Sequence, residues 1–128
     1  MSNAAFWYQQ ASDRGDINAQ YALGLMYEAG RGVSQNYKKA ASLYLAAAEN
    51  GHVESQVNLG VVFVKGKSSL QNYIQAHMWF NIAASQGSRT ARDDRDNIAK
   101  QMVPQDISTA QQLAQSCVLQ NYNVCSPL

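Results

Sequence analysis

A fixed interval of 36 residues organises this chain. The segment 15–30 returns as 51–66, and both copies keep a Gln, a Leu-Gly pair and the closing Gly at the same relative positions. Pairs of large apolar residues in the flanking helices keep the same interval, at Trp7-Tyr8, Leu43-Tyr44 and Trp79-Phe80. Such self-similarity is the signature of a solenoid, because each unit buries its apolar face only by stacking on its neighbour. The sequence therefore predicts an all-α fold: an α/α superhelical solenoid of three antiparallel helix pairs with a C-terminal capping helix.

The spacing of apolar residues and the positions of Gly and Pro predict where each helix lies. We expect helix pairs over 4–14 with 17–29, 37–50 with 53–64, and 73–86 with 89–102, then a last helix over 105–121 that packs on the third unit. Residues 4–128 would form a single domain, with repeats at about 4–36, 37–72 and 73–102 and a capping helix and tail at 103–128.

The first three residues stand outside this pattern. Ser2-Asn3-Ala4 resembles the remnant of an expression tag, so we leave residues 1–3 out of the fold. The first helix also lacks the Asn-Tyr start that the two later units have at Asn36 and Asn72. We hypothesise that the natural chain extends upstream, into a signal peptide or further repeats.

Two glycines fall in the middle of expected helices. A Gly there costs about 1 kcal/mol relative to Ala, yet Gly24 returns as Gly60. This recurrence indicates that two helices approach closely at these points. The aromatic residues at helical spacing are expected to fill the core rather than bind a cofactor or nucleic acid; they are Trp7, Tyr8, Tyr44, Trp79 and Phe80.

The helix expected over 89–102 departs from the repeat. Arg95-Asp96 replaces the Leu-Gly pair of the earlier units. Arginines and aspartates four apart predict a solvated face with weak ion pairs, Arg89 with Asp93 and Arg92 with Asp96. A polar outer helix of this kind ends a solenoid without leaving an apolar surface.

Composition excludes some classes of partner. The net charge is +1 and charged residues make up 15% of the chain, so no strong field attracts nucleic acid or an anionic membrane. No apolar run is long enough for a membrane span. The polar surface is built largely from amides, with 14 Gln and 10 Asn.

The repeat resembles a known family. A helix carrying Leu43-Tyr44 and Ala47-Ala48, then Gly51, and a second helix carrying Gln56, Leu59-Gly60 and Phe63 before Gly66, are similar to Sel1-like repeats, relatives of the tetratricopeptide repeat. The departures are Ser68-Ser69 in the second loop and the polar third unit. The resemblance implies a bacterial α/α superhelix that acts as a protein-interaction scaffold, without catalysis or a cofactor. It does not name the protein or peptide partner.

The two cysteines, Cys117 and Cys125, lie eight residues apart near the C-terminus. An even count in a small, amide-rich chain favours a disulfide and an oxidising compartment, hence a periplasmic or secreted location. The alternative is one buried cysteine and one free tail thiol in a cytoplasmic protein. The resemblance adds weight to the disulfide, because some secreted bacterial members carry disulfides between helices.

The residues that could carry chemistry are scattered. His52 and His77 have no metal-ligating partner at a familiar spacing, and no nucleophile motif such as Ser-x-x-Lys occurs. We therefore expect neither a metal site nor an enzyme. Two alternatives stay open: a secreted, disulfide-stapled protein that interacts with β-lactams or the cell wall, as some relatives do, and a structural spacer within a longer chain.

The remaining candidate site is the concave side of the solenoid, which the first helix of each pair should line. Positions outside the apolar stripe of these helices are the expected groove: Gln9, Gln10, Lys39, Ser42, Leu45, Glu49, Gln75, Met78, Asn81 and Ser85. Amides mixed with Leu and Met suit an adaptable peptide-binding surface on a monomer. The competing interpretation is that these are ordinary solvated positions.

Overall fold

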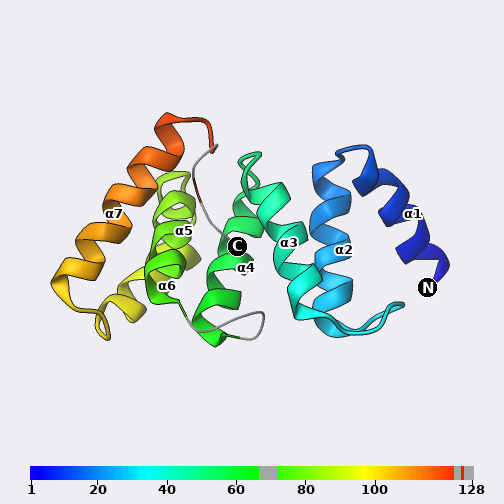
Figure 1. Ribbon diagram of the computed structural model, residues 1–128, viewed down its shortest axis with the longest axis horizontal. Coiled ribbons are helices and arrows are strands. Elements are labelled where there is room, and N and C mark those ends of the chain that lie inside the picture. The colour runs from blue at the N-terminus through cyan, green and yellow to red at the C-terminus, as the bar shows by residue number, and fades with distance from the viewer. Residues whose placement is uncertain (67–71, 123–124, 126–128) are drawn as a thin grey trace.

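The computed structural model describes residues 1–66, 72–122 and 125 of the chain. These residues form seven helices and no strand (Figure 1). The helices are α1 (Asn3–Asp13), α2 (Ile17–Ala29), α3 (Tyr37–Ala48), α4 (Val53–Lys65), α5 (Tyr73–Ser85), α6 (Arg89–Ala99) and α7 (Pro104–Leu119). The all-α solenoid is confirmed. Ser68 and Ser69, where the second loop departs from the family pattern, and the last three residues of the tail lie outside the described residues.

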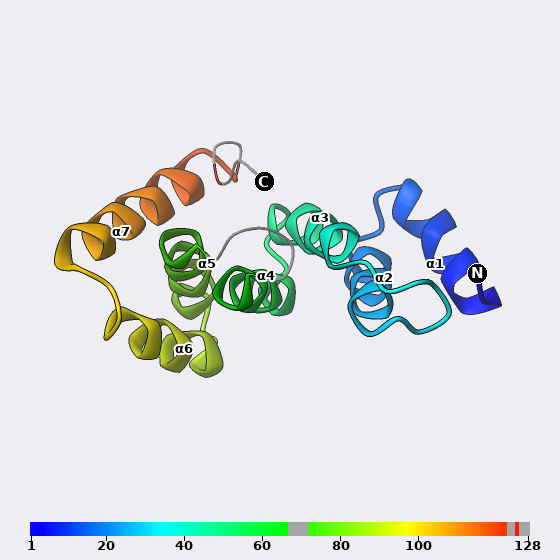
Figure 2. The same ribbon diagram turned by 60° about the horizontal axis from the view of Figure 1, so that its bottom comes forward.

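The helices follow one another along the long axis of the molecule in chain order, and each packs on the next as far as α6 (Figures 1 and 2). The last helix breaks this order, because α7 packs against α5. A lid over the third unit was expected from the sequence, and α7 is that lid. In the described part of the chain, no helix has both the length and the apolar character needed to cross a bilayer.

Side-chain caps set where the helices begin. Asn36 and Asn72 accept a hydrogen bond from the third backbone N–H of α3 and α5, and each donates its own N–H to the carbonyl of Tyr27 or Phe63 in the preceding helix. The recurring Gln-Asn-Tyr sequence is therefore a helix start tied to its neighbour. Gly30 and Gly66 end α2 and α4 in the left-handed conformation that favours glycine.

The two mid-helix glycines are points of close helix packing, as predicted. A Cβ on Gly24 would lie 2.7 Å from Cε1 of Tyr44, and one on Gly60 would lie 2.5 Å from Cε1 of Phe80. Both rings are buried. Each glycine therefore admits an aromatic ring of the next helix directly onto the helix backbone.

The first aromatic pair does not follow this pattern, and the expectation that it fills the core was wrong. Trp7 is 68% exposed and Tyr8 is 41% exposed, whereas Tyr44, Trp79 and Phe80 are buried. The reason is the number of neighbours. Among the described residues, the packing partner of α1 is α2, whereas α3 packs on α2 and α4, and α5 packs on α4, α6 and α7.

The expected ion pairs on α6 were also wrong. Among the described residues, Arg95 pairs with the adjacent Asp96 at 3.1 Å rather than joining a ladder of pairs four apart. Its Nη1 also donates a 2.9 Å hydrogen bond to Oδ1 of Asn81 on α5. Arg95 occupies the register position of the buried Leu23 and Leu59, so it turns towards α5 instead of lying on a fully solvated face.

Candidate binding surfaces

A cleft of about 450 Å³ lies between α5 and α7. Its lining residues, which define the α5–α7 cleft, are Asn81, Ile82, Ser85, Gln111, Ala114, Gln115, Val118 and Leu119. Ile82 and Ala114 are buried and form an apolar floor. Leu119 is 77% exposed at the rim. The cleft therefore combines an apolar floor with amide, hydroxyl and aliphatic groups that face solvent.

The position of α7 depends on both of its ends. Pro104 stands at the first position of the helix, where its missing N–H has no cost. At the other end, a disulfide joins Cys117 to Cys125 with a Cα–Cα distance of 4.7 Å. The structure therefore has the disulfide rather than free thiols.

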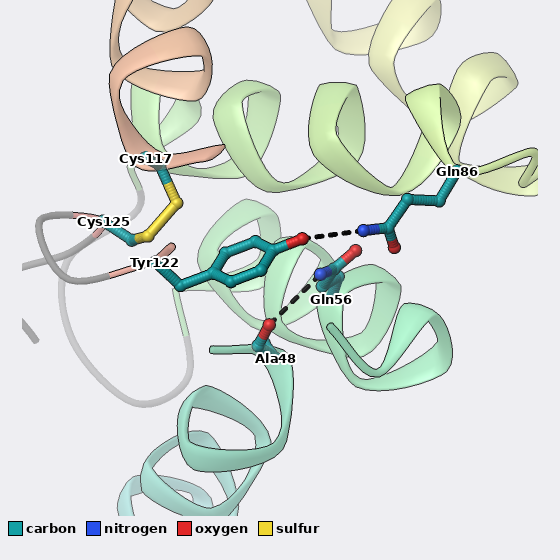
Figure 3. Close-up of a disulfide and its surroundings, with 6 residues drawn as sticks. All are labelled: Ala48, Gln56, Gln86, Cys117, Tyr122 and Cys125. Carbon is teal, nitrogen blue, oxygen red and sulfur yellow. Dashed lines mark hydrogen bonds between the residues drawn. A yellow bond between two sulfur atoms is a disulfide. The ribbon is translucent and has the colours of Figure 1, made fainter. Parts of the chain in front are cut away.

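Tyr122 lies between this disulfide and α5 (Figure 3). Its backbone N–H donates a 2.7 Å hydrogen bond to the carbonyl of Cys117, and its hydroxyl oxygen accepts a 2.8 Å hydrogen bond from Nε2 of Gln86. Asn121 and Tyr122 both adopt left-handed backbone angles, which turn the chain back after α7. The disulfide thus ties Cys125 back to α7, and the side-chain hydrogen bond between Tyr122 and Gln86 links the turn after α7 to the end of α5.

The ten groove residues expected from the sequence do not form one depression in the structure. Asn81 and Ser85 line the α5–α7 cleft. Lys39 lines a separate depression of about 260 Å³ beside the 33–36 loop, with its Nζ 5.2 Å from the centre of the Tyr27 ring. Ser42 is exposed, and the half-buried members are Gln9, Gln10, Leu45 and Glu49. Burial raises the pKa of the Glu49 carboxyl.

Two of the ten residues cannot contact a partner as expected. Met78 is 0% exposed and Gln75 is also buried. The register positions of Met78 in the earlier helices, Phe6 and Ser42, are exposed. The difference arises because α7 packs on α5, while in the described part of the chain no corresponding helix covers α1 or α3.

Besides the buried Ile82 and Ala114, four exposed cleft residues were missed because α7 was treated only as a lid. They are Gln111, Gln115, Val118 and Leu119. A signal was present in the sequence. The buried positions Ala110, Ala114 and Cys117 are spaced three and four apart. The residues that directly follow them, at 111, 115 and 118, therefore lie together on an adjacent face of the helix.

Two further depressions lie on the side of the second helices. One of about 370 Å³ involves α2, α3 and α4, another of about 530 Å³ involves α2, α4 and the start of α6, and Asn58 lines both. Beside the first, Tyr44 donates a 2.6 Å hydrogen bond to Glu28. Burial, followed by this hydrogen bond and the negative charge of Glu28, raises the pKa of Tyr44. The hydroxyl is therefore a neutral structural donor.

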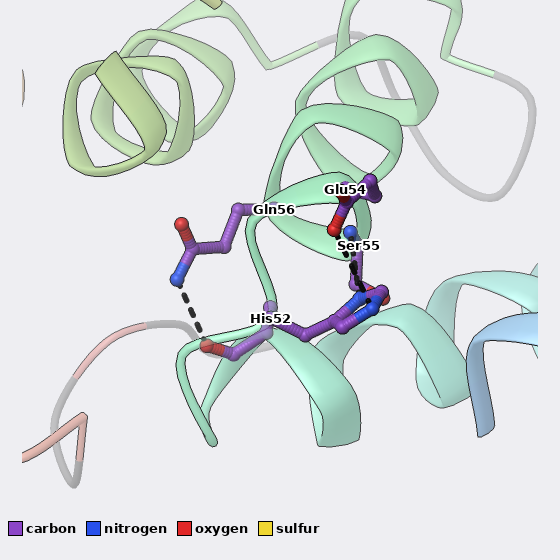
Figure 4. A network of polar contacts seen from close by, with 5 residues as sticks. His52, Glu54, Ser55 and Gln56 are labelled. Atoms are coloured by element: carbon purple, nitrogen blue, oxygen red, sulfur yellow. Dashed lines mark hydrogen bonds and ion pairs between the residues drawn. The ribbon is translucent and has the colours of Figure 1, made fainter. Parts of the chain in front are cut away.

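His52, Ser55 and Glu54 superficially resemble a catalytic triad (Figure 4). Nδ1 of His52 lies 2.7 Å from Oγ of Ser55, and Nε2 lies 3.5 Å from a Glu54 carboxylate oxygen. However, Ser55 is fully buried, and Nδ1 also accepts a hydrogen bond from the Ser55 N–H at the start of α4. The group therefore caps a helix and offers no accessible nucleophile.

The other histidine is also unsuited to chemistry. His77 is buried in α5, and burial, followed by the positive charge of Arg95, lowers its pKa while Asp96 acts in the opposite direction. The described part of the chain contains no group of three or more His, Cys, Asp or Glu residues arranged to hold a metal ion.

Comparison with known proteins places this geometry in a family. The Sel1 repeat model matches residues 1–16, 17–52 and 53–88. Comparison with curated protein sequences gives no match.

Two crystal structures are similar to the chain. A protective antigen present in uropathogenic Escherichia coli strains, which displays an SLR fold, is 26% identical with a TM-score of 0.86, over 92% of this chain and 26% of that one. A Sel1 repeat protein from Oxalobacter formigenes is 36% identical with a TM-score of 0.68, over 71% of this chain and 37% of that one. Proteins of this family are generally non-catalytic scaffolds that mediate protein–protein interactions. The chain belongs to the Sel1 repeat family.

Proposed function

We propose that this protein is a non-catalytic interaction module that binds an extended peptide segment of a partner protein in the α5–α7 cleft. The observation that carries the proposal is the lining of the cleft, where the buried side chains of Ile82 and Ala114 lie beneath the amides of Gln111 and Gln115. Asn81 and Ser85, two of the groove residues expected from the sequence, belong to the same lining.

This lining suits a peptide for a physical reason. An amide side chain both donates and accepts hydrogen bonds, so it can pair with the N–H and C=O groups of an extended backbone. The apolar floor and the exposed Leu119 offer a place for one or two side chains of the partner, whose burial would supply most of the affinity. The net charge of +1 provides little electrostatic steering, so shape and hydrogen bonding would select the partner.

The cysteine chemistry supports a proposal for the compartment. The Cys117–Cys125 disulfide holds the turn after α7, and such bonds persist in oxidising environments. We therefore propose that the protein works in the bacterial periplasm or outside the cell, as a monomer.

The proposal is tested by site-specific photocrosslinking in the cell that makes the protein. A benzophenone amino acid replaces Gln115, which lines the cleft, or Gln112, which is exposed on the same helix outside the lining. We expect a discrete protein adduct from position 115 and none from position 112. Adding Leu119→Ser should weaken the adduct several-fold. Equal adducts from both positions, or an adduct that Leu119→Ser leaves unchanged, would contradict binding in this cleft.

A further inference from the structure

A depression of about 370 Å³ lies among α2, the start of α3 and α4. Its lining residues, which define the Glu28 pocket, are Leu25, Glu28, Ala29, Tyr37, Asn58 and Val61. Three of these six residues are aliphatic, one is aromatic, and Glu28 is the charged one. The pocket therefore combines apolar walls with a single negative charge.

The Glu28 carboxylate is oriented by a buried partner. Its Oε1 accepts a 2.6 Å hydrogen bond from the hydroxyl of Tyr44, whose side chain is buried. Glu28 itself is half-buried and forms no ion pair with the other described residues. An ionised carboxylate has about four lone-pair sites, so the bond from Tyr44 leaves most of its accepting capacity unused. The pocket thus holds an oriented anion that has no cation beside it.

Asn58 adds a second oxygen to the pocket. Burial, followed by the hydrogen bond and the charge of Glu28, raises the pKa of Tyr44, whereas the side chain of Asn58 acts to lower it. A side chain that donates to the phenol oxygen has this lowering effect, because it stabilises the ionised form. Nδ2 of Asn58 therefore faces Tyr44, and Oδ1 is the atom left for a ligand.

The repeat shows that the fold does not need this carboxylate. Tyr44 and Glu28 return after 36 residues as Phe80 and Val64. Phe80 is buried against α4 as Tyr44 is buried against α2, so the same contact between helices forms without a hydroxyl or a carboxylate. A half-buried charge has a desolvation cost. Because stacking of the helices does not require that cost, Glu28 fits a role in binding.

We propose that the Glu28 pocket binds an arginine side chain of a partner protein. A guanidinium group carries five N–H donors and no acceptor, so it matches a pocket that offers the oxygens of Glu28 and Asn58. Its methylene stem would pack along Leu25 and Val61, and Tyr37 adds an aromatic surface for the planar cation. A lysine ammonium is a compact point charge without this planar fork.

The neighbouring depression indicates what surrounds the arginine in the partner. It measures about 530 Å³, shares Asn58 with the Glu28 pocket, and continues past α4 to the start of α6. Tyr21, Val53 and Val57 supply apolar surface there. We therefore expect the arginine to belong to a protein segment with apolar neighbours. The Glu28 pocket is lined by different helices from the α5–α7 cleft, and the inference does not rest on that cleft.

The test is an NMR titration of the isotope-labelled protein with three capped peptides. One is Ala-Leu-Arg-Leu-Ala, and the other two carry citrulline or lysine in place of the arginine. Citrulline keeps the shape of arginine and lacks its charge. We expect the arginine peptide to shift the amide resonances of Leu25, Asn58 and Val61. It should bind several-fold more tightly than the lysine peptide and roughly tenfold more tightly than the citrulline peptide.

Variants of the protein separate this site from general charge effects. Glu28→Gln keeps an acceptor for Tyr44 and removes the negative charge, so it should weaken binding of the arginine peptide roughly tenfold. Asp13→Asn, at an exposed position of α1, changes the net charge equally and should leave the affinity unchanged. Leu119→Ser, in the α5–α7 cleft, should also leave it unchanged, so failure of one proposal is distinguishable from failure of the other.

Several results would overturn the proposal. They are equal affinity for the arginine peptide and either of the other two peptides, equal affinity of wild type and Glu28→Gln, and no shift at these amides with millimolar peptide. Self-association of the protein that Glu28→Gln abolishes would place a second copy of the chain in the pocket and would also overturn it.

Discussion

The ring of Phe80 lies so close to Gly60 that a Cβ on that glycine would be 2.5 Å from Cε1 of the ring. Tyr44 and Gly24 repeat the same contact one unit earlier, at 2.7 Å. The same contact, between a glycine of one helix and an aromatic ring of the next helix, thus occurs twice in this solenoid. We call this contact the glycine–ring joint. Stacking of the units depends on the joint, because it sets how closely consecutive helices approach.

The first prediction concerns this joint. Gly60→Ala should destabilise the protein by up to about 2 kcal/mol, because overpacking costs about 1–3 kcal/mol and the better helix propensity of Ala returns only about 1 kcal/mol. Urea denaturation followed by circular dichroism measures the change. Asn97→Ala, at an exposed position of α6, is the matched control and should leave stability unchanged or slightly raised. A Gly60→Ala protein as stable as the control would show that the ring can move aside.

The second prediction concerns the Tyr44–Glu28 hydrogen bond. Tyr44→Phe should cost about 0.5–1.5 kcal/mol near neutral pH, the usual net value of such a bond. The raised pKa of Tyr44 means that the folded state keeps the phenol proton more tightly than the unfolded state does. The stability that the protonated Tyr44 contributes is therefore fully present below the unfolded pKa of about 10 and is lost as the pH rises above that value. Stability curves of both proteins from pH 7 to 11 test this.

In that experiment, the wild-type protein should lose stability above pH 10 faster than Tyr44→Phe does. Parallel curves for the two proteins would mean that Tyr44 ionises as easily in the folded state as in the unfolded chain. Tyr37→Phe, at the start of α3, serves as a second tyrosine variant for comparison.

The third prediction concerns the disulfide. Closing a loop of this length should stabilise the protein by roughly 2–3 kcal/mol on the loop-entropy estimate, so reduction should lower the melting temperature by several degrees. Cys125→Ser should show the lower temperature with or without reductant. Mass spectrometry should find that the oxidised protein gains two hydrogen atoms on reduction. Two free thiols in protein purified without reductant would rule out the bond.

The fourth prediction concerns His77. Burial lowers its pKa, so the folded state favours the neutral ring, and Nδ1 has no hydrogen-bond partner among the described residues. The stability that the neutral His77 ring contributes is therefore fully present above the unfolded pKa of about 6.5 and is lost as the pH falls below that value. His77→Gln should therefore reduce the loss of melting temperature between pH 7 and 5. His52→Asn, which keeps a capping side chain on α4, should retain that loss. The same acid sensitivity in His77→Gln and wild type would assign it to other groups.

Much of the fold could be predicted from the sequence because its determinants are local. The 36-residue interval, the capping residues Asn36 and Asn72 and the paired glycines act within one helix or between consecutive helices. The ends of α3, α6 and α7 were placed two or three residues too late, because turn residues separate α3 from Gly51 and α6 from Pro104, the positions used as stop signals.

The candidate site was only partly predictable. Asn81 and Ser85 were identified from their register, but Met78 and Gln75 were placed on the surface because the repeat alone leaves that face of α5 open. The exposure of Trp7 was missed because the repeat pattern treats the three pairs of large apolar residues alike, whereas α1 has fewer packing partners among the described residues than α3 and α5 have.

The sequence by itself determined the helices, their order and the contacts between consecutive helices, because a periodic pattern repeats the same local packing in each unit. Only the tertiary structure decided that α7 lies on α5, that Tyr122 links the turn after α7 to Gln86 at the end of α5, and that a cleft opens beside it. The physical reason is that α7 lies outside the period. Its place depends on how its apolar face fits a helix distant in the sequence, and no repeated pattern records that fit.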